Sequence, residues 1–161
     1  MRSAARLVLV LLSTAMLAAA VAVAPASAAT TDQVAGIETA ATSSTGTFFG
    51  VLLNEFGTWQ TTIVHADLNK APGGATALTG GSFTVSPLFG TASGGAITGG
   101  QIVAQAPSGD VFCTQQFVGG GTIQAASGTG SFQVTLTHYG FISNGVCNAF
   151  FASVTGSITL P

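Results

Sequence analysis

Two histidines and one aspartate are the residues best suited to chemistry in this chain. His65 and Asp67 are two positions apart, so in an extended strand their side chains share one face. His138 supplies a second imidazole. Two histidines and a carboxylate are the ligand set of a facial metal triad, and the same groups can act as a general acid–base pair.

Their local contexts argue against such a site. Asp67 opens the turn-forming segment Asn69–Gly74, where we expect a solvated side chain. His138 ends the apolar face of a predicted strand beside Tyr139, a position typical of a half-buried packing residue. We therefore treat His65, Asp67 and His138 as the weaker, polar candidate site and expect no metal ion there.

Other catalytic patterns are missing from the sequence. There is no Gly-x-Ser-x-Gly elbow for a nucleophilic serine, and no Gly-x-Gly-x-x-Gly fingerprint for a dinucleotide. Glu38 and Glu55 could serve glycoside hydrolysis only if they faced each other across a cleft, and nothing in the sequence places them together. We expect no catalytic residues and no cofactor.

The two cysteines, Cys113 and Cys147, are expected to form a disulfide. The pairing would close a loop of about 35 residues, worth roughly 3–4 kcal/mol in the chain-entropy model. It requires export to an oxidising compartment. The N-terminus predicts that export: basic Met1–Arg6, uncharged Leu7–Ala24 and a small-residue site ending at Ala28 form a secretory signal peptide at residues 1–28. An uncleaved membrane anchor is the alternative.

Charge is scarce throughout the chain. Only 5% of its 161 residues are charged, while 47% are hydrophobic. From residue 29 onward Lys70 is the single cation, opposed by five carboxylates: Asp32, Glu38, Glu55, Asp67 and Asp110. This balance excludes the basic footprint of a nucleic-acid-binding protein.

The distribution of residue types predicts a loosely ordered leader at residues 29–45 and a β domain at residues 46–161. From Gly46 onward Thr, Val, Ile and Phe alternate between glycine-rich turns. The predicted strands are Thr47–Asn54, Thr58–Ala66, Ser82–Ser86, Ala96–Ala104, Val111–Val118, Thr122–Ala126, Ser131–Tyr139 and Val146–Leu160, the last broken near Gly156. Short strands without intervening amphipathic helices predict an all-β fold, an antiparallel β-barrel or β-sandwich of 7–9 strands.

Glycine pairs recur at a similar place in three of these strands. An apolar residue and a threonine precede the first two pairs, Gly80-Gly81 and Gly99-Gly100. A looser third copy, Gly119-Gly120-Gly121, directly follows Val118. We expect bends or bulges there, of the kind that barrel corners use.

The aromatic residues are numerous enough to fill one core. The adjacent pairs Phe48-Phe49 and Phe150-Phe151 are exceptions, because strand neighbours point to opposite faces and one member of each pair must leave the core. We interpret these four residues as candidate exposed apolar contacts: Phe48, Phe49, Phe150 and Phe151.

The function that fits best is that of a secreted, non-catalytic β module that binds a small apolar ligand or a surface partner, or joins the cell-surface layer. One alternative is a self-assembling or membrane-inserted envelope protein, for which the low charge argues and the membrane-inserted form is the weaker. The other is a small isomerase-like barrel enzyme using His65, Asp67 or His138. The sequence leaves the oligomeric state open.

Overall fold

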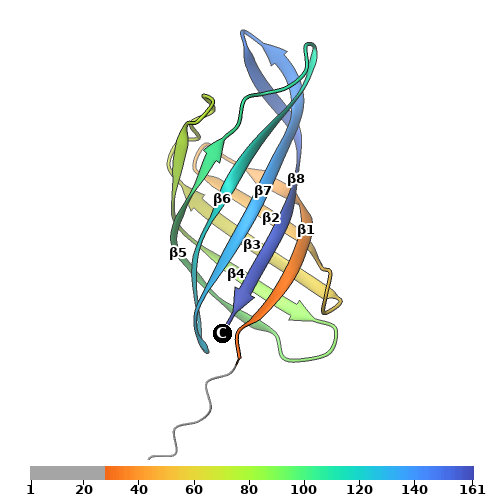
Figure 1. The fold of residues 1–161 in the computed structure, drawn as a ribbon, viewed down its shortest axis with the longest axis vertical. Helices are drawn as coiled ribbons and strands as arrows, with labels where there is room; N and C mark the ends of the chain where they lie inside the picture. Colours follow the sequence, from red (N-terminus) through yellow and green to blue (C-terminus); the bar gives the residue numbers. More distant parts are fainter. Residues whose placement is uncertain (1–27) are drawn as a thin grey trace, which may run out of the picture.

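The protein is a closed barrel of eight antiparallel strands (Figure 1). The computed structural model describes residues 28–161. Each strand pairs with the next along the chain, and β1 pairs with β8 to close the ring. The strands are β1 (Thr30–Ala41), β2 (Thr45–Leu52), β3 (Gly57–His65), β4 (Ala75–Pro87), β5 (Ser93–Ala104), β6 (Phe112–Ala125), β7 (Gly128–Ser143) and β8 (Val146–Leu160).

The all-β fold class is confirmed, and of the two predicted architectures the barrel is the one formed. Two predicted strands, Val111–Val118 and Thr122–Ala126, are one continuous strand, β6, because its glycines stay paired with both neighbours. β8 likewise runs unbroken through Gly156, which pairs with Val34 and Val134. No helix in residues 28–161 is long and apolar enough to cross a membrane. The predicted signal peptide, Ala28 apart, lies outside the described residues.

The prediction of a loosely ordered leader at residues 29–45 is wrong. Those residues contain β1 and the start of β2, and β1 pairs with β2 on one side and β8 on the other. The alternation of β1 was hard to recognise because its inward positions include Asp32, Gly36 and Glu38, with Val34 as the large apolar residue.

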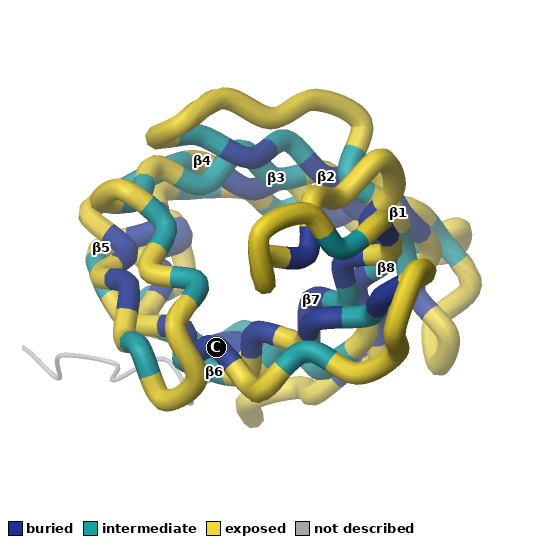
Figure 2. Tube along the Cα trace, turned by 90° about the horizontal axis from the view of Figure 1, so that it is seen from above, coloured by how far each residue is buried: buried dark blue, intermediate teal, exposed yellow. Residues whose placement is uncertain are grey.

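Side chains alternate between the inside and the outside of the barrel, as a period of two requires. In β7, Phe132, Leu136 and His138 are buried, whereas Gln133 and Tyr139, which follow Phe132 and His138, are exposed. Seen from above, buried and exposed positions alternate along the strands around the ring (Figure 2). The buried apolar residues from all eight strands form one core cluster. The barrel therefore has an apolar inner wall.

The predicted irregularities form at the glycine repeats of β4 and β5, whereas β6 runs through Gly119-Gly120-Gly121 in unbroken register with β7. Gly81, Gly99 and Gly100 have positive φ angles of 138°, 154° and 146°, and the register of β5 against β6 shifts between Ile97 and Gly99. Gly100 pairs with Gly121 of β6, so glycines lie side by side in the two strands. A band of residues without side chains thus lets this part of the sheet curve tightly enough to close.

Gly80 and Gly81 offer a matched test of this bend. A Cβ atom on Gly81 would clash with the carbonyl oxygen of Thr62, and its φ of 138° suits only glycine. A Cβ atom on Gly80 would meet nothing within 4 Å. We expect Gly81→Ala to lower the free energy of unfolding by about 2–4 kcal/mol and Gly80→Ala to change it by less than about 1 kcal/mol, measured by urea denaturation. Equal effects of the two substitutions would contradict the bend's dependence on glycine.

Candidate functional site

A cavity of about 780 Å³ lies inside the barrel. Strands all around the ring contribute apolar side chains to its wall, including Val34, Phe48, Trp59, Leu78, Phe83, Ile97, Ile123, Phe132, Leu136 and Val154. Thr42 and Ser43 of the β1–β2 loop and Leu68 and Lys70 of the β3–β4 loop also line it. The cavity therefore reaches the end of the barrel that carries these loops, which we call the mouth. Its volume lies within the range of sites for drug-sized ligands.

Two titratable side chains, Glu38 and His138, face each other on this apolar wall. Glu38 belongs to β1 and His138 to β7, the strands on either side of β8. Ser153 of β8 pairs with Ile37 of β1 and also with Thr137 of β7. One residue further along each strand, Glu38, Ala152 and His138 form an inward row. Because the middle residue is only an alanine, the two longer side chains can approach each other across it.

The two groups come close without forming a hydrogen bond. His138 Nε2 is 4.0 Å from Glu38 Oε2, beyond the range of a hydrogen bond. His138 Nε2 is buried and has no hydrogen-bond partner within residues 28–161. The imidazole packs on Phe117, with ring centroids 5.0 Å apart. The side chains of His138 and Glu38 are 11% and 17% exposed, so both polar ends are largely withdrawn from solvent.

Burial shifts the pKa of both groups toward their neutral forms. It lowers the pKa of His138 to about 4, and the positive charge of Lys70 adds to this shift. Burial also raises the pKa of Glu38, while the nearby imidazole of His65 partly opposes the rise. His138 is therefore neutral at pH 7, and the two groups do not form an ion pair there.

The three residues of the predicted polar site, His65, Asp67 and His138, all line the cavity, but they do not form one cluster. His65 ends β3, is partly exposed, and its Nδ1 lies 2.7 Å from the carbonyl oxygen of Ala66. Asp67 is exposed, as its place in a turn predicted. Within the described part of the chain, no group of three or more His, Cys, Asp and Glu side chains could hold a metal ion. The carboxylate beside His138 is Glu38.

Glu38 is the site residue that sequence reasoning missed. It was assigned to the leader, and only the pairing of β1 with β8 brings it next to His138. The available signal was the two-residue spacing of Asp32, Val34, Gly36 and Glu38, which marks one face of a strand. Glu55, considered with it for glycoside hydrolysis, is exposed in the β2–β3 turn and does not line the cavity.

A second acidic side chain of β1 is buried for a structural reason. The carboxylate of Asp32 accepts hydrogen bonds from the backbone N–H groups of Asn54 (2.8 Å) and Glu55 (3.3 Å). It thereby holds the β2–β3 turn against the start of β1. Within residues 28–161 the carboxylate of Glu38 accepts no comparable hydrogen bond from the protein.

Three of the four phenylalanines predicted as exposed apolar contacts are exposed, and Phe48 is not. Phe49 is 47% exposed, but Phe48 is 6% exposed and points into the cavity, so it is not an outward contact. Phe150 and Phe151 are both exposed. The register of β7 against β8 shifts at this point, with Tyr139 opposite Phe151 and Gly140 opposite Ala149. Phe150 is the extra residue of this bulge, and strict alternation therefore fails there.

Phe150 belongs to an outer aromatic patch near the mouth. The ring of Phe141 lies between those of Phe112 and Phe150, with centroid distances of 4.8 and 5.3 Å. Tyr139 and Phe151 form a further pair at 5.7 Å. The patch covers the outer face of β6, β7 and β8 where the β7–β8 hairpin projects at the top of Figure 1.

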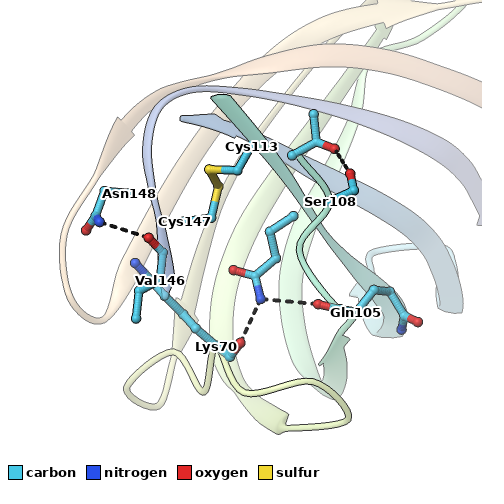
Figure 3. Close-up of a disulfide and its surroundings, with 9 residues drawn as sticks. Lys70, Gln105, Ser108, Cys113, Val146, Cys147 and Asn148 are labelled. Atoms are coloured by element: carbon cyan, nitrogen blue, oxygen red, sulfur yellow. Dashed lines mark hydrogen bonds between the residues drawn. A yellow bond between two sulfur atoms is a disulfide. The ribbon is translucent and has the colours of Figure 1, made fainter. Parts of the chain in front are cut away.

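A disulfide and the hydrogen bonds of one buried glutamine side chain connect strands and loops around the mouth (Figure 3). Cys113 in β6 and Cys147 in β8 form the predicted disulfide, which spans β7. Nearby, the fully buried amide of Gln115 donates hydrogen bonds to the carbonyl oxygens of Lys70 (2.6 Å) and Gln105 (3.2 Å). The β3–β4 loop is thereby fastened to β6 beside the cavity.

The shifted pKa of His138 predicts how stability depends on pH. An unfolded chain binds a proton at histidine near pH 6.5, whereas folded His138 binds it only near pH 4. Between these values the unfolded state holds more protons than the folded state. The contribution of His138 to the free energy of unfolding therefore falls by up to about 3 kcal/mol as the pH drops from 6.5 to 4. Glu38 acts in the opposite sense, because its raised pKa lets the folded state take up a proton first.

We therefore expect His138→Gln to lose most of the acid destabilisation that the wild-type protein shows between pH 6.5 and 4. Urea denaturation at a series of pH values measures the effect. Thr137→Gln, at the neighbouring position of β7 and without a titratable group, is the control and keeps the wild-type profile. Coincident profiles for His138→Gln and the wild type would show that His138 does not carry this pH dependence.

Comparisons with known proteins assign no relationship to this chain. No protein-family model matches it, and neither a curated protein nor a solved structure matches it significantly. The chemistry of the cavity is therefore the basis for a functional proposal.

Proposed function

We propose that the protein is a secreted, non-catalytic binding protein that holds a small apolar ligand inside its barrel. The cavity of about 780 Å³ is the observation that carries this proposal. Small-molecule sites are typically concave, mostly apolar and furnished with a few polar groups, and this cavity fits that description. An eight-stranded barrel is also wide enough to hold one small ligand.

The outer surface supports a role in water. The outward positions of β7 are mostly uncharged polar residues: Thr129, Ser131, Gln133, Thr135 and Thr137. A barrel inserted in a membrane has the reverse arrangement, with an apolar outer band and a polar interior. The cell-envelope alternative rests on the outer aromatic patch and on further exposed apolar side chains, among them Phe49, Phe56 and Phe89, which would serve self-assembly or a surface partner. Secretion is compatible with the predicted signal peptide and with the disulfide.

Native mass spectrometry of the protein purified from its secreting host tests the proposal directly. We expect a non-covalent adduct of drug-like mass that is released on denaturation, together with saturable binding of an environment-sensitive apolar dye. A protein that shows neither an adduct nor dye binding would contradict the proposal.

Adjacent residues of β8 provide a matched pair of variants for locating the site. Val154 is buried and lines the cavity, whereas Thr155 is exposed on the outer face. Val154→Phe fills part of the cavity, so we expect it to weaken dye binding by about tenfold or more, while Thr155→Phe leaves affinity within about twofold. Titration by fluorescence measures both, and thermal melts check that each variant folds. Equal affinities in both variants would place the dye outside the barrel.

The second candidate function is an isomerase-like enzyme, favoured by the Glu38–His138 pair. A carboxyl group with a raised pKa beside a neutral imidazole in an apolar cavity is an arrangement that acid–base enzymes use. The ligand extracted from the purified protein can be returned to it in D₂O. Solvent deuterium incorporation that is lost in Glu38→Gln would favour the enzyme, and recovery of the unchanged ligand favours the binding protein.

A further inference from the structure

We propose that Glu38 and His138 together bind a hydroxyl group of the ligand, so that the natural ligand is an apolar alcohol. The inference rests on the proposed binding function and assigns the chemical class of ligand. It starts from the 4.0 Å separation of the two side chains, both of which line the cavity.

The gap has the dimensions of a bridging oxygen atom. Glu38 Oε2 and His138 Nε2 are 4.0 Å apart, too far for a direct hydrogen bond. An oxygen about 2.8 Å from each atom would span this distance with an angle of about 90° at the oxygen, and both contacts would have ordinary hydrogen-bond lengths. Since His138 Nε2 is buried and has no hydrogen-bond partner among the described residues, such a bridge would satisfy it.

A ligand atom that binds both Glu38 and His138 must donate one hydrogen bond and accept another. A carboxylate at Glu38 only accepts hydrogen bonds, while a neutral imidazole nitrogen that carries its proton donates one. A hydroxyl group does both with a single oxygen. It also fits a protonated Glu38, from which it can accept, so that the raised pKa of Glu38 does not remove the interaction.

Other head groups fit less well. A ketone or ether has no donor for the carboxylate. A carboxylate ligand would place a second negative charge beside Glu38. An ammonium group has no lone pair to accept from the imidazole, and the positive charge of Lys70 already acts on His138. A pure hydrocarbon would leave both polar groups desolvated and unpaired, which is unfavourable.

The position of the pair also orients the ligand. Glu38 lies near the end of β1 that leads into the β1–β2 loop, at the mouth. The wall on the opposite side of the pair, toward the start of β1 and the end of β8, is lined by apolar Ile123, Phe132 and Ile158. An alcohol would therefore enter with its apolar part first and keep its hydroxyl near the mouth.

The experiment compares probes that share a skeleton and differ in the head group. The linear set is 1-decanol, decyl methyl ether, decanoate and decylammonium, and the fused-ring set is decahydro-2-naphthol with its methyl ether and ketone. Displacement of the apolar dye gives each affinity. We expect the alcohol of at least one skeleton to bind about tenfold or more tightly than its methyl ether, and decanoate and decylammonium to bind more weakly than decanol.

Substitutions of Glu38 and His138 then test whether these two residues cause the preference for the alcohol over the ether. Glu38→Leu and His138→Leu should each reduce the alcohol-over-ether preference to about twofold or less while dye binding persists, because an apolar side chain needs no polar partner. Glu55→Leu is the matched control, since Glu55 is exposed at the opposite end of the barrel, and it should keep the full preference.

The failures of the two proposals are distinguishable. If the dye and all probes fail to bind, the binding function itself is wrong. If alcohols and ethers bind alike, or if decanoate or decylammonium binds more tightly than decanol, the binding function stands and the alcohol assignment is overturned. A preference that survives both Glu38→Leu and His138→Leu would also overturn it.

Discussion

The pairing of β1 with β8 is the constraint on which the rest of the structure depends. Eight residue pairs, from Thr30 with Leu160 to Ile37 with Ser153, join the first strand to the last. This ladder converts an open sheet into a ring without edge strands, which would otherwise invite aggregation. It also determines which inward side chains meet across β8. Glu38 and His138 are 100 positions apart in the sequence, yet closure makes them neighbours.

Closing the ring creates an interior that the side chains do not fill. Ala152, which lines the cavity, stands between Glu38 and His138. Small residues on the wall leave volume where larger ones would have packed. An apolar void forfeits dispersion contacts, so the empty barrel is less stable than it could be. A ligand that binds only the folded state recovers that loss, since stability rises with ligand concentration relative to Kd.

The sequence predicted those features that depend on local pattern. Alternation over Phe132–His138 identified a half-buried strand, the glycine repeats identified the bend, and Cys113 with Cys147 identified the disulfide. The features it missed depend on contacts between distant strands. β1 has the period of a strand, but with aspartate, glycine and glutamate among its inward residues it lacks the apolar face that marks one. The bulge at Phe150 likewise arises from register against β7, which no local pattern encodes.

The two acidic residues of β1 show how a buried charge can be assigned a role. Asp32 receives two backbone N–H groups, so its burial is compensated within the protein and explains a turn. Glu38 faces an imidazole that is too distant to bond and neutral at pH 7, so its burial costs stability without a matching gain. An apolar pair in the same row would pack against the wall with no such cost. Proteins place buried polar groups without a compensating partner mainly at functional sites. In this barrel such groups lie in the row of Glu38, Ala152 and His138.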